Sequence, residues 1–417
     1  MEKLKIIGKQ KLFGEVEIRA AKNAVLPILA CCLLTKKEVV LHNVPHLLDI
    51  DNMLSILKSM GAKVSFKKNT IVICCLDATP SLVSTELTGA LRSSIFILGP
   101  VLARFKKIQL GLPGGCAIGA RPIDIHLKAL RDLNAAVIEE EGYIECDSTS
   151  MQSGATTLAF PSVGATENLI MAAVFNPSLT IIKNAAREPE IVDLANFINF
   201  LGGRVHGAGT SMVVVEGVRE FFGGDYQPIG DRIVAPTVLG AVAMTKGSVT
   251  VKGVNPLHFT PVLDIFDSMG CKVKQGKNYV ELSQSKKLRA VEKIITRPYP
   301  DFPTDMQAQI VAALSLANGN SIVKETIFEN RFSYVKELEK MGAEIVVENN
   351  KAIISGVEGL HGAEVYAEDL RGGAALVMAA LAANGQSVVQ DVRHIDRGYE
   401  KIERMFGLLG AKIERVP

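Results

Sequence analysis

A short motif recurs six times along the chain, and this repetition limits the folds that the sequence can adopt. Each copy has an apolar residue, a turn residue, a small residue, a variable residue and a β-branched residue, as in Met60-Gly61-Ala62-Lys63-Val64. Another apolar residue three positions earlier marks the buried stripe of a helix. Glycine and asparagine tolerate the left-handed conformation that ends many helices. The six turn residues are Gly61, Asn134, Gly202, Gly270, Gly342 and Gly410.

Every repeat also contains a second, more apolar helix. Such helices must be buried on most sides. Short strands of alternating pattern follow them, as at Glu38–Leu41, Ser248–Val251 and Ser387–Val389. The predicted buried helices span Asn23–Leu34, Gly89–Leu102, Gly164–Phe175, Arg232–Thr245, Thr304–Ala317 and Asp369–Ala383.

The spacing of the repeats predicts two domains. Units of about 70 residues are too long for a typical solenoid, whereas three of them make a domain of about 200 residues, which is an ordinary size. Between the third and fourth units, residues 217–231 hold Gly223-Gly224, Pro228 and Gly230. The sequence therefore predicts an α/β protein with two pseudo-threefold domains.

Bulk composition excludes several classes of protein. Hydrophobic residues make up 48% of the 417-residue chain and charged residues 22%, with a net charge of +2, so nothing in the overall charge favours nucleic acid or a membrane surface. Residues 1–9 lack the apolar core of a signal peptide. The longest apolar run, Ala24–Leu34, contains Pro27 and is too short to cross a bilayer. We expect a cytosolic protein.

The seven cysteines show neither an even disulfide framework nor zinc-ligand spacing. Cys31, Cys32 and Cys74 lie in apolar stretches, and we expect them to be packed in the core. Cys116 differs, because it lies in Leu112-Pro113-Gly114-Gly115-Cys116-Ala117-Ile118-Gly119-Ala120-Arg121-Pro122. Flanking glycines allow close approach to a ligand, and a nearby guanidinium favours a reactive thiolate. Composition alone is also compatible with a surface loop that contains an incidental cysteine.

This loop resembles the catalytic loop of the UDP-N-acetylglucosamine enolpyruvyl transferases, and the resemblance extends over essentially the whole chain. It implies a two-domain inside-out α/β barrel of six βαβαββ repeats, three per domain, around buried helices. The active site is then expected in the inter-domain cleft. Residues 22–229 would form the first domain, which carries the Cys116 loop, and residues 1–21 and 230–417 the second.

The resemblance also assigns ligands for phosphoenolpyruvate (PEP). Read alone, a lysine before an apolar helix could be solvated and a buried arginine could be part of a structural ion pair. Asp305, in the first turn of a predicted helix, could simply compensate the helix dipole; the resemblance makes it the contact of the sugar 3′-hydroxyl and the candidate general base. The residues implied to bind PEP are Lys22, Asn23, Arg92, Arg121, Arg371 and Arg397.

A second set is implied to bind the UDP-sugar. Ser162-Val163-Gly164 opens a helix and could otherwise be ordinary capping; in the family it binds the diphosphate. Ile327 corresponds to a position of the uridine pocket. The full set is Arg121, Pro122, Ile123, Asp124, Ile125, Ser162, Val163, Gly164 and Ile327.

The implied reaction is an addition followed by an elimination, at the first committed step of peptidoglycan synthesis. Cys116 is expected to protonate C3 of PEP and to be able to bond to it covalently, with Lys22, Asn23, Asp305 and Arg397 as the other catalytic residues. No metal, organic cofactor or obligate protein partner is expected.

The sequence departs from the family pattern at two places, and two rival functions stay open. The departures are Arg19-Ala20-Ala21 and Val234-Ala235-Pro236, where relatives usually have Ser-Gly before the lysine and Glu-Ala-Gly. One rival is the related transfer to shikimate 3-phosphate, whose enzyme lacks the cysteine loop. The other is a silent UDP-sugar-binding regulator, against which the joint presence of Lys22, Cys116 and Asp305 argues.

Overall fold

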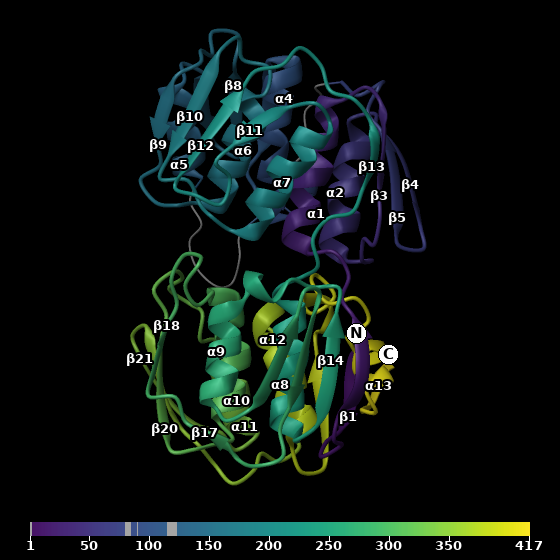
Figure 1. The fold of residues 1–417 in the computed structure, drawn as a ribbon, viewed down its shortest axis with the longest axis vertical. Helices are drawn as coiled ribbons and strands as arrows, with labels where there is room; N and C mark the ends of the chain where they lie inside the picture. Colours follow the sequence, from purple (N-terminus) through teal and green to yellow (C-terminus); the bar gives the residue numbers. More distant parts are fainter. Residues whose placement is uncertain (1, 80–84, 90, 115–122) are drawn as a thin grey trace. The chain divides into compact units, whose positions relative to one another are not determined.

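The computed structural model describes residues 2–79, 85–89, 91–114 and 123–417. These residues form two compact units, each a mixture of helices and strands (Figure 1). One unit consists of the described residues between Ala20 and Ile229. The other consists of Gly230–Pro417 together with the described residues of Met1–Arg19. Cys116, Arg121 and Pro122 lie outside the described residues.

Apolar helices form the centre of each unit, as their composition predicts. In the unit of Gly230–Pro417, α8 (Val234–Thr245), α10 (Gln307–Leu314) and α12 (Leu370–Ala382) pack against one another (Figure 1). The corresponding helices of the other unit are α1 (Lys22–Cys31), α4 (Leu98–Phe105) and α6 (Val163–Ala173), and α4 packs against α6. Three 3₁₀ segments adjoin these helices: η1 (Cys32–Leu34), η2 (Arg92–Ile97) and η4 (Thr304–Met306).

A second helix of each repeat ends at the repeated motif. Asn134 has a φ of 66°, and the five turn glycines have φ between 88° and 97°, so all six predicted left-handed turns are confirmed. The paired apolar residues before them, such as Leu57 and Met60, are buried in every copy. These helices are α2 (Leu48–Ser59), α5 (Asp124–Asp132), α7 (Pro189–Phe200), α9 (Thr260–Ser268), α11 (Val335–Lys340) and α13 (Ile402–Leu408).

Three sheets of the unit between Ala20 and Ile229 are formed by the described residues. Two of them have one parallel edge pair and otherwise antiparallel strands, and β6-β8-β7 is antiparallel throughout. Their orders are β13 (Gly224–Tyr226)-β3 (Glu38–Leu41)-β5 (Thr70–Cys74)-β4 (Lys63–Lys67), β6 (Lys107–Gly111)-β8 (Tyr143–Asp147)-β7 (Ala136–Glu140), and β11 (Arg204–His206)-β12 (Met212–Glu216)-β10 (Leu179–Lys183)-β9 (Ala155–Thr157).

Three four-stranded sheets with the same mixed pattern belong to the other unit, with one short parallel pair beside them. The orders are β15 (Lys272–Gly276)-β16 (Tyr279–Ser283)-β14 (Ser248–Lys252)-β2 (Phe13–Glu17), β18 (Lys293–Ile295)-β20 (Asn320–Lys324)-β22 (Lys351–Ser355)-β21 (Glu344–Glu348), β23 (Glu364–Tyr366)-β24 (Gln386–Gln390)-β1 (Lys3–Ile7)-β25 (Lys412–Val416), and β17 (Leu288–Arg289)-β19 (Ala317–Asn318). The remaining short helices are α3 (Thr85–Gly89), η3 (Pro256–His258) and η5 (Val392–His394).

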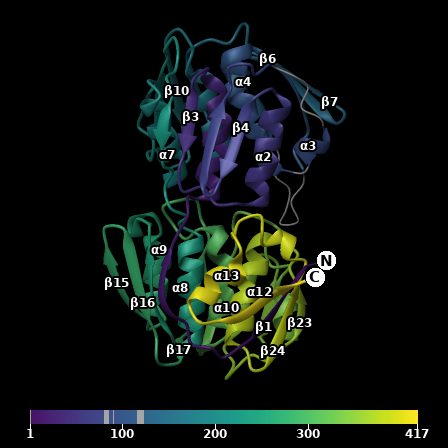
Figure 2. The ribbon, with the colours of Figure 1, turned by 90° about the vertical axis from the view of Figure 1, so that its right-hand side faces the viewer.

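The two ends of the chain meet in one sheet. Strand β1 lies between β24 and β25, antiparallel to both, with Leu4 opposite Arg415 (Figure 2). The last repeat is thereby completed by the first residues of the chain. The expected α/β architecture around buried helices is confirmed; among the described residues the strands form separate sheets and do not close into a single barrel.

Strand alternation corrects one expectation about the cysteines. Cys31 and Cys32 are buried as expected, but Cys74 is only half-buried. In β5 the inward positions are Ile71 and Ile73, so Cys74 points the other way and the following Cys75 is the buried thiol.

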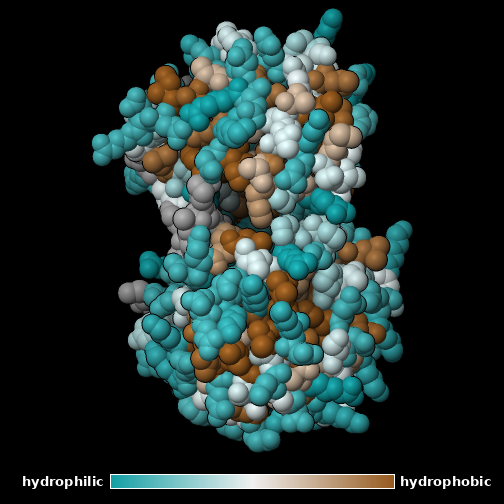
Figure 3. Space-filling view, turned by 90° about the vertical axis from the view of Figure 1, so that its left-hand side faces the viewer, coloured by the Kyte–Doolittle hydropathy of each residue, from teal (hydrophilic) through white to brown (hydrophobic). Residues whose placement is uncertain are grey.

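Exposed hydrophobic residues are interspersed with hydrophilic ones on the surface (Figure 3). None of the described helices is long and apolar enough to cross a membrane.

Candidate active site

Lys22 is the first residue of α1 and is only 8% exposed. Its Nζ atom lies 3.0 Å from Oδ2 of Asp49, on α2, and Asp49 is 2% exposed. Burying a lysine without a partner is costly, so the ion pair explains how this side chain is held at the helix start. Asn23 follows and is half-buried. Lys22 is therefore not the solvated helix start that the sequence alone allowed.

Three elements meet around His126, which the sequence analysis did not single out. Arg92 begins η2, His126 lies on α5 and Gly164 lies in the first turn of α6. A Cβ atom at Gly164 would stand only 3.0 Å from Cε1 of His126, so a larger residue there would require the imidazole to shift. Burial, and then the charge of Arg92, lowers the pKa of His126 to about 4. The imidazole is neutral at neutral pH.

The hydrogen bonds of Asn168 define the tautomer of this imidazole. Oδ1 of Asn168 accepts from the backbone N–H of Gly99 at 2.8 Å, and Nδ2 donates to the carbonyl of Ile95 at 3.0 Å. Nδ2 also lies 3.0 Å from Nδ1 of His126. Nδ1 must then accept, and the proton of the neutral ring is on Nε2. His126 therefore has a donor on the ring edge beside Gly164.

The start of α6 is built as the sequence predicts. Ser162 is the N-cap, and its Oγ accepts from the N–H of Ala165 at 3.4 Å. Ser162, Val163 and Gly164 are all half-buried, so the first backbone donors of the helix lie near the surface, where they can bind an anion. Ile123, Asp124 and Ile125 lie at the start of α5: Asp124 is exposed and both isoleucines are half-buried.

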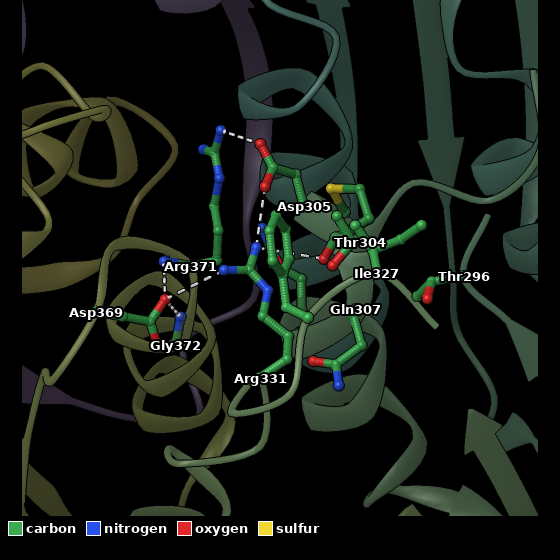
Figure 4. Close-up of polar contacts among 12 residues, drawn as sticks. Thr296, Thr304, Asp305, Gln307, Ile327, Arg331, Asp369, Arg371 and Gly372 are labelled. Carbon is green, nitrogen blue, oxygen red and sulfur yellow. Dashed lines mark hydrogen bonds and ion pairs between the residues drawn. The ribbon is translucent and has the colours of Figure 1, made fainter. Parts of the chain in front are cut away.

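In the other unit, Asp305 is held by two buried arginines (Figure 4). Nη2 of Arg331 donates to Oδ1 and Nη2 of Arg371 donates to Oδ2, each at 2.9 Å. The arginine side chains are 4% and 5% exposed, whereas Asp305 is 27% exposed. The carboxylate of Asp305 thus lies between the two buried guanidinium groups and the surface of the unit.

Arg371 is further held by Tyr399, whose hydroxyl accepts from Nη1 at 3.4 Å. That hydroxyl lies 3.0 Å from Oγ1 of Thr237, and Nε2 of Gln309 donates to both oxygens at 3.3 Å. Burial lowers the pKa of Arg371, but Asp305 and the other nearby groups raise it by more. Arg371 therefore stays a cation throughout the physiological range.

Glu325 joins the loop of Ile327 to the segment that carries Asp305. It is 1% exposed, and its carboxylate accepts from Oγ1 of Thr296 at 2.8 Å and from Oγ1 of Thr304 at 2.9 Å. The N–H of Ile327 donates to the same carboxylate at 2.8 Å. The half-buried Ile327 is thus fixed relative to η4.

Asp369 and Arg397 complete this group. Asp369 caps α12 through the N–H groups of Arg371 and Gly372, at 2.9 and 3.1 Å, and its Oδ1 lies 3.8 Å from Nη1 of Arg331.

Arg397 is half-buried in the turn between η5 and α13. Burial, followed by the charges of Arg393 and Arg397, lowers the pKa of His394. Asp305, Arg371 and Arg397, which are far apart in sequence, therefore belong to one unit.

Arg331 and Tyr399 were not predicted as site residues. Arg331 is buried, and so is Tyr334 three residues later. This pair does not form an apolar pattern with the period of a helix or a strand, so the sequence gives no sign that Arg331 belongs to the site. Only the fold shows that Arg331 reaches Asp305. Among the described residues, no group of three or more His, Cys, Asp or Glu side chains is arranged to hold a metal ion.

The chain is similar to known proteins over essentially its whole length. The family model for EPSP synthase (3-phosphoshikimate 1-carboxyvinyltransferase) matches residues 6–406. UDP-N-acetylglucosamine 1-carboxyvinyltransferase 2 of Caldanaerobacter subterraneus subsp. tengcongensis is 48% identical over 416 residues, which cover 100% of both chains. The UDP-N-acetylglucosamine 1-carboxyvinyltransferase of Dichelobacter nodosus is 45% identical over 417 residues, covering 100% of this chain and 99% of the relative. The crystal structure of the enolpyruvyl transferase NikO from Streptomyces tendae has a TM-score of 0.89 at 20% identity, covering 100% and 99%, and supports the fold.

Proposed function

The chain belongs to the EPSP synthase family of carboxyvinyltransferases, and we propose that it transfers the enolpyruvyl group of PEP to the 3′-hydroxyl of UDP-N-acetylglucosamine. Similarity over the full length to enzymes named for that reaction, at 45–48% identity, carries the proposal. The paired cations around Asp305 and the buried Lys22 support it, because a trianionic substrate needs several fixed positive charges.

The reaction proceeds by addition and then elimination. In the addition, Cys116 donates a proton to C3 of PEP, the sugar oxygen bonds to C2, and the hydroxyl proton passes to Asp305. In the elimination, C3 returns a proton to the Cys116 thiolate, the bond between C2 and the phosphate oxygen breaks, and the double bond re-forms. Inorganic phosphate leaves with the proton that Asp305 holds, so both residues return to their starting states. General acid and base catalysis of this kind contributes about 10²–10⁴-fold to the rate.

Cations of both units are assigned to PEP. Lys22, Arg92 and Arg121 bind its phosphate, with Asn23 beside Lys22, and Arg371 and Arg397 bind its carboxylate. Oδ2 of Asp305 accepts a 2.9 Å hydrogen bond from Arg371. The PEP carboxylate competes for the same guanidinium, so Oδ2 of Asp305 is released to accept the proton of the 3′-hydroxyl. Binding of PEP and activation of the sugar 3′-hydroxyl are thereby linked.

The UDP moiety is assigned to two loops and a helix start. Arg121, Pro122, Ile123, Asp124 and Ile125 bind the nucleotide. Ser162, Val163 and Gly164 bind the diphosphate through backbone donors and the serine hydroxyl. Ile327, fixed by Glu325, closes the uridine pocket. A neutral His126 behind Gly164 adds no charge to this site.

The cellular assignment follows from the substrates. We place the enzyme in the bacterial cytoplasm, at the first committed step of peptidoglycan synthesis. PEP and UDP-N-acetylglucosamine are its partners, and the proposed reaction uses no metal, organic cofactor or second protein. We keep residues 22–229 and residues 1–21 with 230–417 as the two functional domains.

Identification of the product tests the proposal. The purified chain is incubated with PEP and UDP-N-acetylglucosamine, and the nucleotide products are analysed by mass spectrometry and NMR. We expect one new species, the 3′-enolpyruvyl ether, formed by the native chain and almost absent with the Asp305→Asn variant. An unchanged nucleotide with the native chain would support the silent regulator instead.

A further inference from the structure

Glu325 directly follows strand β20 and places one carboxylate between two parts of the candidate site. Its backbone N–H donates to the carbonyl of Asn350 at 2.8 Å, and the residue is 1% exposed. A buried carboxylate is costly unless hydrogen-bond donors surround it, and hydrogen bonds to a charged acceptor are about twice as strong as neutral ones. The groups that bind Glu325 are therefore held firmly to the end of this strand.

Each oxygen of this carboxylate binds a different segment. Oε1 accepts from the N–H of Ile327 and from Oγ1 of Thr296, both at 2.8 Å. Oε2 accepts from Oγ1 of Thr304 at 2.9 Å. The N–H of Thr326 donates in turn to Oγ1 of Thr296 at 2.9 Å, so the loop that carries Ile327 is closed around Oε1. A change at Thr304 can therefore remove one connection and leave the other in place.

Thr304 is the first residue of η4 and immediately precedes Asp305. Its carbonyl accepts from Nη2 of Arg331 at 3.3 Å, and the same nitrogen donates to Oδ1 of Asp305 at 2.9 Å (Figure 4). The backbone beside Asp305 is thus held through a carbonyl by Arg331 and through a hydroxyl by Glu325. In the proposed reaction, Asp305 gives up its bond to Arg371, so the bonds to Thr304 then contribute more to the position of the base.

The relative position of Asp305 and Ile327 matters for the proposed acceptor. A nucleotide sugar presents its 3′-hydroxyl at a distance from the uracil that is limited by the diphosphate joining them. A general base must lie within hydrogen-bond reach of the proton that it removes, and small misplacements reduce the rate strongly. One residue that binds both segments keeps the base and the uridine pocket in register with one acceptor.

We propose that Glu325 is a positioning residue that holds Asp305 and Ile327 in a fixed relation, so that a nucleotide sugar bound against Ile327 presents its 3′-hydroxyl to Asp305. The proposal rests on the proposed function, in which Asp305 is the base and Ile327 belongs to the uridine pocket. It goes beyond that function, because Glu325 is assigned no contact with substrate and acts through Thr304 and Ile327.

Variants of Thr304 test the connection to the base. Thr304→Val keeps the shape of the side chain but removes the donor to Oε2, and we expect kcat to fall about tenfold or more while both KM values stay within about twofold of native. Thr304→Ser keeps the hydroxyl and is expected to retain most of the native kcat. Thr245→Val is the control that should keep native kinetics, because it removes a buried hydroxyl of the same unit that bonds to carbonyls of its own helix.

Binding of UDP tests the connection to the pocket without any turnover. Glu325→Ala removes the acceptor of the Ile327 N–H, and we expect its affinity for UDP, measured by isothermal titration calorimetry, to fall about tenfold. Thr304→Val leaves the bonds to Oε1 in place, and is expected to bind UDP as the native chain does.

The outcomes separate this inference from its premise. A folded Thr304→Val protein with native kcat overturns the inference, as does an equal loss of kcat in Thr304→Ser or native UDP affinity in Glu325→Ala. A rise of both KM values in Thr304→Val would indicate a general loss of structure and would also overturn it. If Glu325→Ala does not fold, the two Thr304 variants decide. Native kcat in Asp305→Asn, or no binding of UDP by the native chain, would instead remove the premise, and with it the role of Glu325.

Discussion

The ammonium group of Lys22 lies 3.0 Å from the carboxylate of Asp49, and both side chains are buried. The ion pair is expected to contribute to the stability of the fold, and Lys22 is also expected to contribute to turnover. Variants of the two residues can separate these contributions. Removing one partner of a buried pair costs about 3–5 kcal/mol because the other charge is left uncompensated.

Lys22→Met is accordingly expected to lower both the free energy of unfolding and the turnover. The double variant Lys22→Met/Asp49→Asn removes both charges of this pair and is expected to regain most of the stability but none of the turnover. Denaturant unfolding and phosphate-release assays on the same preparations check this. Recovery of activity in the double variant would show that Lys22 has only a structural role.

Asp305 is predicted to contribute to kcat but not to the affinity for PEP. Asp305→Asn keeps the size of the side chain but removes the carboxylate that Arg371 and Arg331 bind. We expect kcat to fall by about 10²–10⁴-fold and KM for PEP to stay level or fall, because Arg371 loses its competitor. Asp301→Asn, at an exposed position near the same segment, is the control. A raised KM for PEP with native kcat would contradict the assignment.

The reactivity of the cysteine thiols can also be predicted. Burial raises the pKa of Cys31 and Cys32, and it raises those of Cys75, Cys146 and Cys271 to about 12, so these thiols are poor nucleophiles. We expect the epoxide fosfomycin, a PEP mimic, to label Cys116 alone, as peptide mass spectrometry would show. Cys116→Asp keeps an acid and should resist the drug. Labelling of any other cysteine at a similar rate would refute the prediction.

Much of the fold follows from the sequence because it depends on local rules. The six left-handed turns follow from glycine or asparagine after an apolar stripe, and the buried helices follow from their composition. The contacts of the site do not follow, because Asp305, Arg331 and Arg371 meet only through the packing of separate repeats. The partner of Lys22 was missed for the same reason: Asp49 looks like an ordinary acid in the first turn of α2. The roles of Cys116 and Arg121 stay predictions from the family resemblance.

Stability toward acid should depend on His126. Its pKa falls from 6.5 to about 4 on folding, so the unfolded chain binds the proton more readily between these values. This contribution to stability is complete above about pH 6.5 and is lost as pH falls toward 4. His126→Gln keeps an acceptor for Asn168 and should lose less stability between pH 7 and pH 5 than the native chain does. His206→Gln, at an exposed position of β11, should behave as the native chain. Equal acid sensitivity of the His126 variant would contradict this account.

Phosphate release from PEP with two different acceptors distinguishes the proposed reaction from its nearest rival. Initial rates are measured with saturating PEP and either UDP-N-acetylglucosamine or shikimate 3-phosphate, using the native chain and the Cys116→Ala variant. We expect rapid release with UDP-N-acetylglucosamine, background release with shikimate 3-phosphate, and loss of the rapid reaction in the variant. Rapid release with shikimate 3-phosphate and none with the nucleotide sugar would contradict it.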